Sequence, residues 1–379
     1  MRRSVFLIFS LILVVACSVV PGARAAADPD YSQIIASEAS WITSAQIPAG
    51  HGDASGAIPI SNDPSNGEWD VKPYDANIAA WGLLANGTTD APQVKAWMQW
   101  YFNHLNWPDY NGVYATIYDY YINDTTYAVT PVPDGSSGHA FYDSTDSYAA
   151  TFLTLCRAYA QTTGDYSFLQ SNQYQINQII GAIMATKQSD GLTWAKPDYQ
   201  GKLLMDNSEV YSGLSDAAWL YQNVFTDDPS GYSYYAAEAN DVKTGILTYL
   251  WDAHTPNMFS TIKGSDGSTD TVSWSNWYPD ATSQLWPIKA GIVSGSEATS
   301  LWDTFDATWP NWVTTVNNPD GMPWGAIGYT AAFMGDKTDA DSFLANADTN
   351  YMANGNPWPW SAREAGFTMQ AAKLDSQLP

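Results

Sequence analysis

The chain has 379 residues, of which 39 are Asp or Glu and only 15 are Lys or Arg, so its formal net charge is −24. Such a charge argues against nucleic acids, anionic lipids and polyanionic glycans as partners, because like charges repel. Aromatic residues make up 14% of the chain, with 18 Trp and 24 Tyr. The sequence contains no Cys/His spacing typical of a metal site, and we expect no cofactor.

The first predicted element is an export signal. Two arginines at positions 2 and 3 precede an apolar run over residues 5–20, and an A-x-A cleavage pattern follows at 23–25. We expect a signal peptide over residues 1–25 and a secreted protein. The alternative is a lipoprotein signal in which Cys17 carries a lipid anchor. No later segment is apolar enough to span a membrane, and residues 26–379 contain no linker, so we expect one domain.

Two kinds of helical segment then alternate along the chain. Apolar residues spaced i, i+3, i+4, i+7 predict six amphipathic helices, within residues 34–45, 94–105, 176–184, 235–250, 298–309 and 343–351. Between them lie six segments that are apolar nearly all round and that we expect to be buried: 77–85, 147–160, 210–221, 281–292, 325–334 and 365–373. Pro287 should kink or shorten the fourth of these.

This alternation predicts an all-α fold of the (α/α)6-barrel type, with an outer ring facing water and a buried inner ring. Short β-hairpins are expected in the loops at one end. A cluster of aromatic, proline and polar residues precedes each buried segment, at 72–75, 141–146, 205–209, 276–280, 321–324 and 357–361. Because the inner helices of such a ring all run the same way, the six clusters should line a single funnel.

The alternation and the clusters resemble the six-hairpin glycosidase superfamily over essentially the whole mature chain. No short diagnostic motif selects one family within it. The superfamily includes inverting hydrolases, unsaturated-uronyl hydrolases, polysaccharide lyases and sugar epimerases. The resemblance therefore implies a carbohydrate ligand more firmly than it implies a particular reaction.

Glycoside hydrolysis requires two carboxyl groups, which inverting enzymes hold ~6.5–9.5 Å apart. Adjacent inner helices, with axes ~8–10 Å apart, could carry such a pair. We predict Asp146 and Glu209 as the acid/base couple, with Asp143, Asp206 and Asp119 as further catalytic candidates. The spacings Asp143-x-x-Asp146 and Asp206-x-x-Glu209 also fit helix-capping boxes, so the competing interpretation is that these carboxylates only bind backbone N–H groups.

Other residues of these clusters and of nearby loops are candidates for stacking on sugar rings or binding hydroxyl groups. They are Tyr74, Asp75, Asn77, Tyr118, Trp194, Asn207, Trp277, Tyr278, Asp280, Gln284, Trp324, Trp358, Trp360 and Glu364. The Asp190-Gly191 pair predicts a hairpin turn that brings Trp194 over the funnel. For the aromatic residues, packing in the core is the competing interpretation.

Carboxylates outnumber bases near the clusters, where only Lys72, His139, Lys196 and Arg363 occur. A lyase acting on uronic acids would need cations for the substrate and a His, Tyr or Lys as proton acceptor. We therefore expect a glycoside hydrolase acting on a neutral poly- or oligosaccharide, with an inverting mechanism. The alternatives are a polysaccharide lyase or unsaturated-uronyl hydrolase, a non-catalytic glycan-binding protein, and a helical scaffold whose clusters are only caps.

Overall fold

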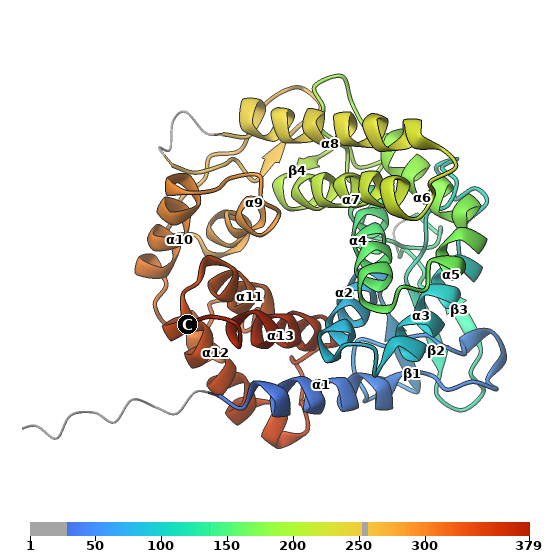
Figure 1. The fold of residues 1–379 in the computed structure, drawn as a ribbon, viewed down its shortest axis with the longest axis horizontal. Coiled ribbons are helices and arrows are strands. Elements are labelled where there is room, and N and C mark those ends of the chain that lie inside the picture. The colour runs from blue at the N-terminus through green and yellow to red at the C-terminus, as the bar shows by residue number, and fades with distance from the viewer. Residues whose placement is uncertain (1–28, 136, 252–256) are drawn as a thin grey trace, which may run out of the picture.

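The computed structural model describes residues 29–379 except residue 136 and residues 252–256, and its helices form two concentric rings (Figure 1). The inner ring contains α2 (Pro73–Leu83), α4 (Thr145–Thr163), α7 (Leu204–Asn223), α9 (Leu285–Lys289), α11 (Gly325–Met334) and α13 (Ala362–Asp375). The outer ring contains α1 (Tyr31–Ala45), α3 (Ala91–Asn103), α5 (Tyr166–Ser171), α6 (Gln173–Thr186), α8 (Pro229–Tyr249), α10 (Ser296–Thr308) and α12 (Lys337–Asn350). The predicted (α/α)6 barrel is confirmed, and every predicted segment lies in its expected ring.

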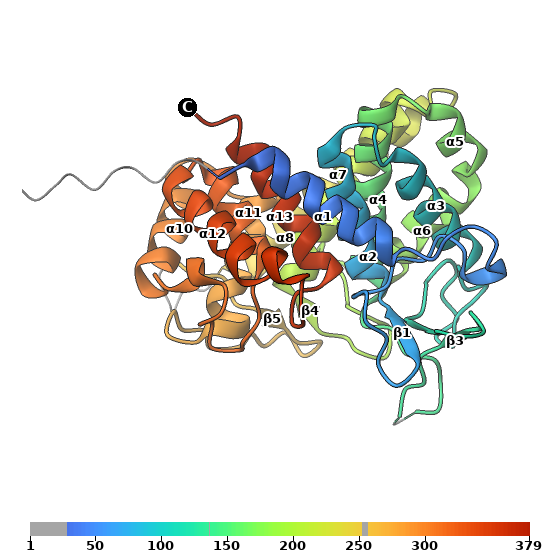
Figure 2. The ribbon, with the colours of Figure 1, turned by 90° about the horizontal axis from the view of Figure 1, so that it is seen from below.

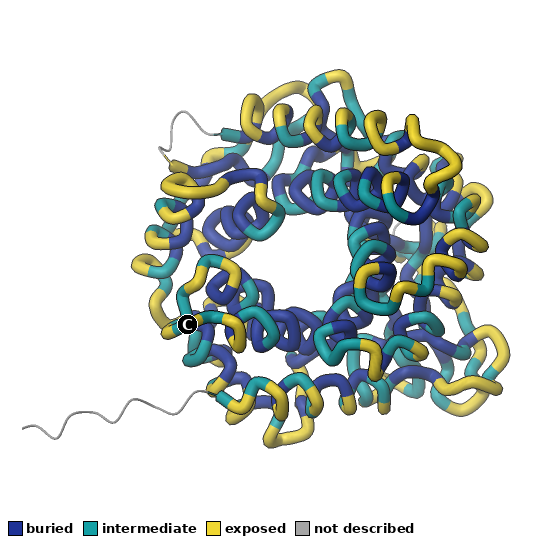
Figure 3. The backbone as a smooth tube through the Cα atoms, in the orientation of Figure 1, coloured by how far each residue is buried: buried dark blue, intermediate teal, exposed yellow. Residues whose placement is uncertain are grey.

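The two rings differ in burial as the patterns predict. The inner ring is mostly buried, whereas the outer helices turn exposed residues toward the solvent (Figure 3). Neighbouring inner helices pack closely, and α13 closes the ring by contacting α2. A Cβ atom at Gly366 of α13 would lie 2.4 Å from the carbonyl oxygen of Ile78 in α2, so only glycine permits this approach.

The fourth inner unit is irregular, as Pro287 predicts. A π-helical turn at Trp277–Ala281 precedes α9, which has only five residues. Pro287 lies inside α9 and has no N–H group to bond to the preceding turn. The expected shortening of this segment is confirmed.

The strands gather at one end of the barrel (Figure 2). Strands β1 (Glu68–Val71), β2 (Tyr120–Asn123) and β3 (Val129–Pro131) form an antiparallel sheet in that order, and β4 (Lys202–Leu203) pairs antiparallel with β5 (Ile262–Lys263). Because β4 leads directly into α7 and β1 ends shortly before α2, this is the end at which the inner helices begin. The short hairpins therefore lie where we expected them.

The proposed signal peptide and Cys17 lie outside the described residues. Within the described part of the chain, no helix has the length and apolarity needed to cross a membrane.

Candidate active site

A cleft of about 910 Å³ lies at the end of the barrel where the inner helices begin. Every inner unit contributes residues to its walls. Among the predicted site residues, those that line it are Tyr74, Asp75, Asp119, Asp143, Asp206, Glu209, Tyr278, Asp280, Trp324 and Glu364. Clusters distant in sequence thus meet around one cavity, because the parallel inner helices bring their first turns together.

The competing interpretation of the acidic spacings was helix capping. The side chains of the N-cap residues Ser144 of α4, Leu203 of α7 and Ser361 of α13 form no capping hydrogen bond with a backbone N–H of their helices. Glu209 and Glu364 bind groups on other segments instead of the N-cap backbone of their own helices. The carboxylates in these first turns are therefore not explained by capping boxes.

Asp206 lies in the first turn of α7 and lines the cleft. Its Oδ2 atom is shut off from solvent and has no hydrogen-bond partner among the described residues. Burial raises the pKa of Asp206 well above its ordinary value, and the nearby charges of Asp146, Glu209 and Asp143 raise it further. The raised pKa favours the protonated form of Asp206, a residue that lines the cleft.

Asp146 lies behind the cleft wall, in the first turn of α4, and does not line the cavity. Thr193 Oγ1 donates to its Oδ2 atom over 2.6 Å, and the Ser147 N–H donates to its Oδ1 atom over 2.8 Å. Burial raises the pKa of Asp146 to about 8 despite these bonds. Asp146 is therefore a buried acid close to Asp206 that does not itself line the cleft.

Glu209 forms part of the floor of the cleft, one turn further along α7. Its Oε1 atom accepts hydrogen bonds from the Tyr74 hydroxyl (2.7 Å) and Trp286 Nε1 (2.8 Å), and Lys289 Nζ lies 3.7 Å away. Glu209 and Trp286 also line a smaller cavity of about 120 Å³, as does Asn77. These residues therefore separate the cleft from a second space within the barrel.

Glu364 stands on α13, which is opposite α7 in the ring order. The Arg363 guanidinium donates to Glu364 Oε1 from Nε (2.9 Å) and from Nη2 (2.7 Å), and the Gly325 N–H donates to Oε2. Arg363 also lies 4.0 Å from Asp75. A cation and a backbone donor thus hold the Glu364 carboxylate, whereas the charged groups with the strongest influence on Asp206 are carboxylates.

Asp119 is a second acid with a raised pKa in the cleft. It lies immediately before β2, and the Tyr148 hydroxyl donates to its Oδ1 atom over 2.9 Å. Burial raises the pKa of Asp119 to about 8, although the bond from Tyr148 and the charge of Lys72 act in the opposite direction. Asp143 differs from it in being exposed, with no hydrogen-bond partner for its carboxylate among the described residues.

Two aromatic rings form an apolar part of the cleft wall. Tyr278 and Trp324 lie with their ring centroids 5.7 Å apart, and Trp324 is held by a hydrogen bond from its Nε1 atom to Asp320. Asp280 accepts hydrogen bonds from the Ser273 N–H and the Asn276 amide, so it also fixes its own loop. The wall therefore combines a stacking surface with carboxylates.

The other predicted binding residues lie outside the main cleft: Asn77, Tyr118, Trp194, Asn207, Trp277, Gln284, Trp358 and Trp360. Several of them hold the scaffold instead. Trp360 is buried and donates to Glu38, Gln284 bonds to the backbone of Phe259, and Asn207 bonds to Thr193.

The packing interpretation fits the buried Trp277, whereas Trp358 is 66% exposed. Tyr118 stacks on Tyr110. Trp194 is half-buried and follows the turn at Asp190-Gly191, where Lys187 and Thr193 form an antiparallel β-bridge.

Sequence reasoning missed several cleft residues, notably Tyr148, Tyr199, Asp270 and Trp286. Tyr148 and Trp286 lie on inner helices shortly after the clusters, so helical spacing from the clusters could have found them. Tyr199 and Asp270 lie in loops and carry no sequence signal. No group of three or more His, Cys, Asp or Glu side chains among the described residues is arranged to hold a metal ion.

No protein-family model matches this sequence, and no curated protein is similar to it in sequence. Solved structures are nevertheless similar in fold. A protein described as "Glycosidase Wild Type" has 13% identity and a TM-score of 0.63, over 92% of this chain and 98% of that one. A GH76 alpha-mannanase from Bacteroides thetaiotaomicron has 15% identity and a TM-score of 0.56, over 91% and 94%.

The GH63 mannosylglycerate hydrolase from Thermus thermophilus, solved with glucose, has 11% identity and a TM-score of 0.60, over 89% of this chain and 98% of that one. The expected resemblance to six-hairpin glycosidases is thus confirmed for the fold. Identities this low carry no information about individual site residues, so the chemistry must be argued from the cleft itself.

Proposed function

We propose that this chain is a secreted glycoside hydrolase that cleaves neutral glycans with two cleft carboxyl groups. The observation that carries the proposal is the state of Asp206, a carboxyl in the cleft wall with a raised pKa and an unpartnered Oδ2 atom. Cleavage of an unactivated glycosidic bond requires a general acid, and a raised pKa favours the protonated form that such an acid needs. The glycosidase neighbours support the same reaction class.

We assign the second role to Glu364, because its surroundings are the opposite of those of Asp206 and its helix faces α7 across the ring. Asp206 donates its proton to the glycosidic oxygen as the bond from that oxygen to the anomeric carbon breaks. A water molecule attacks this carbon and gives its proton to Glu364. We propose inversion, in which the attacking water lies between two carboxyl groups ~6.5–9.5 Å apart. Asp146 and Glu209, the couple expected from the sequence, then act indirectly, by raising the pKa of Asp206.

A neutral substrate follows from the way the cleft cations are used. Lys72 lies 3.6 Å from Asp70, and Arg363 is paired with Glu364, so both cations already have anionic partners. The remaining cleft carboxylates would repel an anionic sugar. Tyr278 and Trp324 offer aromatic faces to the C–H face of a sugar ring.

The experiment is a survey of reducing-sugar release from neutral and acidic polysaccharides, beginning with α-mannan because two neighbours act on mannosides. We expect Asp206→Asn to lower kcat/KM on the best glycan by about 10²–10⁴. The loss should be much smaller on an aryl glycoside, whose leaving group needs no proton. Glu364→Gln should lower both activities, and Asp348→Asn, on the outer helix α12, is the control.

The other outcomes would contradict this proposal in distinct ways. Products that absorb in the ultraviolet would indicate a lyase, and binding without turnover would indicate a glycan-binding protein. If Asp143→Asn abolishes turnover and Glu364→Gln does not, the base is Asp143. Secretion is tested separately, by locating the mature chain in the culture medium or, if Cys17 is lipidated, on the membrane.

A further inference from the structure

Three exposed aromatic side chains lie together on the outer wall of the barrel, outside the cleft. Trp107 and Tyr114 come from the loop after α3, and Tyr174 from the start of α6. They are 44%, 53% and 65% exposed, respectively. None of the three lines the cleft. We call Trp107, Tyr114 and Tyr174 the flank surface.

The three rings are arranged around Trp107. The Tyr174 ring lies parallel to it within 12°, at a centroid distance of 5.9 Å, and the Tyr114 ring stands at 61°, at 6.4 Å. No hydrogen bond from the Trp107 Nε1 atom or from either tyrosine hydroxyl is made to another described residue. The flank surface thus combines apolar faces with free hydrogen-bonding tips, which is the chemistry that a sugar ring presents in return.

The loop that carries Trp107 and Tyr114 is held in place from below. The buried Asp109 carboxylate accepts hydrogen bonds from the Val113 N–H (2.9 Å), the Thr116 hydroxyl (3.0 Å) and the Tyr142 hydroxyl (2.7 Å). The backbone at Asn106 pairs with that at Ala115 and Thr116. Because the loop is already ordered, binding there costs little conformational entropy.

We propose that the flank surface binds a neutral polysaccharide chain, as a second glycan site separate from the cleft. A second copy of this chain fits poorly, since the net charge of −24 repels it. The area is also too small: three aromatic side chains of about 150–250 Å² each, exposed to roughly half, offer on the order of 300 Å². A stable protein partner buries about 800 Å² per side. The charge also disfavours anionic glycans, whereas a neutral glycan needs only rings to stack on.

This inference goes beyond the proposed hydrolysis, because binding at the flank surface requires no turnover. The test uses the full mature chain carrying Asp206→Asn, so that any hydrolysis is slowed during the measurement. Its electrophoretic mobility is measured in native gels containing α-mannan, mixed-linkage β-glucan or dextran, with polygalacturonate as the anionic comparison. To this chain we add the pair Trp107→Ala and Tyr174→Ala, or the control pair Tyr232→Ala and Tyr234→Ala, which removes exposed tyrosines from α8.

We expect at least one neutral glycan to retard the chain and polygalacturonate to leave it unaffected. The flank pair should weaken the retardation about tenfold, while the control pair leaves it unchanged. The inference is overturned if no neutral glycan retards the chain, if the flank pair has no effect, or if both pairs have equal effects. It is also overturned if sedimentation shows a dimer that the flank pair dissociates. A chain that binds through the flank surface but cleaves nothing would refute only the proposed hydrolysis.

Discussion

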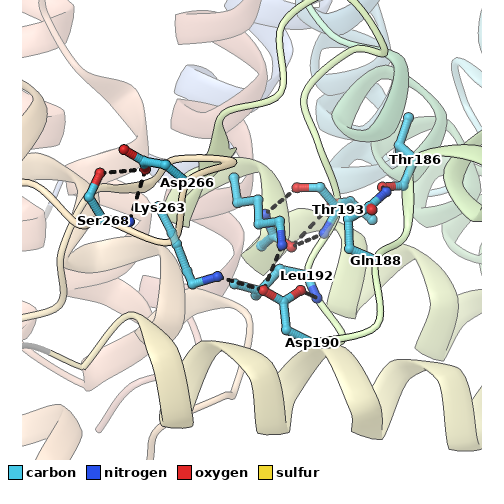
Figure 4. Close-up of polar contacts among 10 residues, drawn as sticks. Thr186, Gln188, Asp190, Leu192, Thr193, Lys263, Asp266 and Ser268 are labelled. Atoms are coloured by element: carbon cyan, nitrogen blue, oxygen red, sulfur yellow. Dashed lines mark hydrogen bonds and ion pairs between the residues drawn. The ribbon is translucent and has the colours of Figure 1, made fainter.

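Asp190 and Asp206 lie on either side of β4, and their surroundings are opposite. Asp190 receives two ammonium groups, from Lys202 at 2.6 Å and from Lys263 at 2.8 Å (Figure 4). Burial alone would raise the pKa of Asp190, but these two lysines bring it below its ordinary value. Asp206 has no cation among its strongest influences, and carboxylates raise its pKa.

This difference separates a carboxylate that builds the scaffold from one that is available for chemistry. The Asp190 ion pairs hold the hairpin to the β4–β5 ribbon, and Leu203 and Ile262 of that ribbon line the cleft. Asp206 leaves a polar atom unpartnered, which costs stability, and it does so in the wall of the cleft. The partners of a buried acid in this fold therefore decide whether it stabilises the scaffold or remains available for chemistry. Variants at Asp190 and at Asp206 test this difference.

The largest effect on stability is expected at Asp190. Asp190→Ala leaves Lys202 and Lys263 unpaired, with side chains only 7% and 14% exposed, and should lower the free energy of unfolding by about 3–5 kcal/mol. Because the folded-state pKa of Asp190 is lowered, its contribution is present above the ordinary aspartate pKa and is lost as the pH falls through the folded value. Urea unfolding at pH 7 and at pH 3 measures both effects.

Asp266→Ala provides the matched control. Asp266 is exposed and accepts hydrogen bonds from Ser268 in its own turn (Figure 4), so its replacement should leave the free energy of unfolding nearly unchanged. Equal losses from Asp190→Ala and Asp266→Ala would show that the two lysines tolerate separation from Asp190.

At Asp206 the pH dependence of the contribution to stability should be opposite to that at Asp190. Its folded-state pKa is raised, so its contribution to stability is greatest below the ordinary aspartate pKa and declines as the pH rises toward the folded value. Asp206→Asn removes this decline and should therefore raise the melting temperature more at pH 8 than at pH 5. The measurement is the melting temperature at the two pH values. If Asp206→Asn is less stable than the unmodified chain at pH 8, Asp206 does not lower the stability of the fold there.

A smaller loss is expected at Thr193, which links the two regions. Its hydroxyl contacts Asp146 and the Asn207 side chain, on either side of Asp206. Thr193→Val should cost about 1–2 kcal/mol, because buried acceptors lose their donor. Thr193→Ser keeps the hydroxyl and should recover most of that loss. Chemical denaturation of the two variants side by side tests this, and similar losses would assign the effect to packing.

The smallest effect is a shift in pH dependence. The charge of Asp143 raises the pKa of Asp206, but it is the weakest of the three acidic contributions. Asp143→Asn should therefore move the alkaline limb of the kcat/KM profile to lower pH by less than about one unit. Asp348→Asn, on the outer helix α12, should leave the limb in place. A shift toward higher pH would mean that Asp143 does not act on Asp206 through its charge.

The sequence predicts the barrel well because its alternating segments record burial directly. It also predicts that the first turns of the inner helices converge. It does not predict which acid of a cluster lines the cleft. Asp143 lines the cleft and Asp146 does not, and this difference depends on where α4 begins between them. Ion pairs such as Asp190 with Lys263 join distant segments whose pairing has no local signature.

The way α13 closes the ring has a consequence for how the protein is made. This last helix packs against α11, α2 and α1, and its Gly366 fits against the carbonyl of Ile78. The surfaces of α1 and α2 that pack against α13 therefore stay uncovered until α13 has been synthesised. Closure depends on contacts between opposite ends of the chain, which makes it a slow and late step in folding. A ribosome-bound or truncated chain that lacks α13 should remain an open arc that chaperones and proteases recognise.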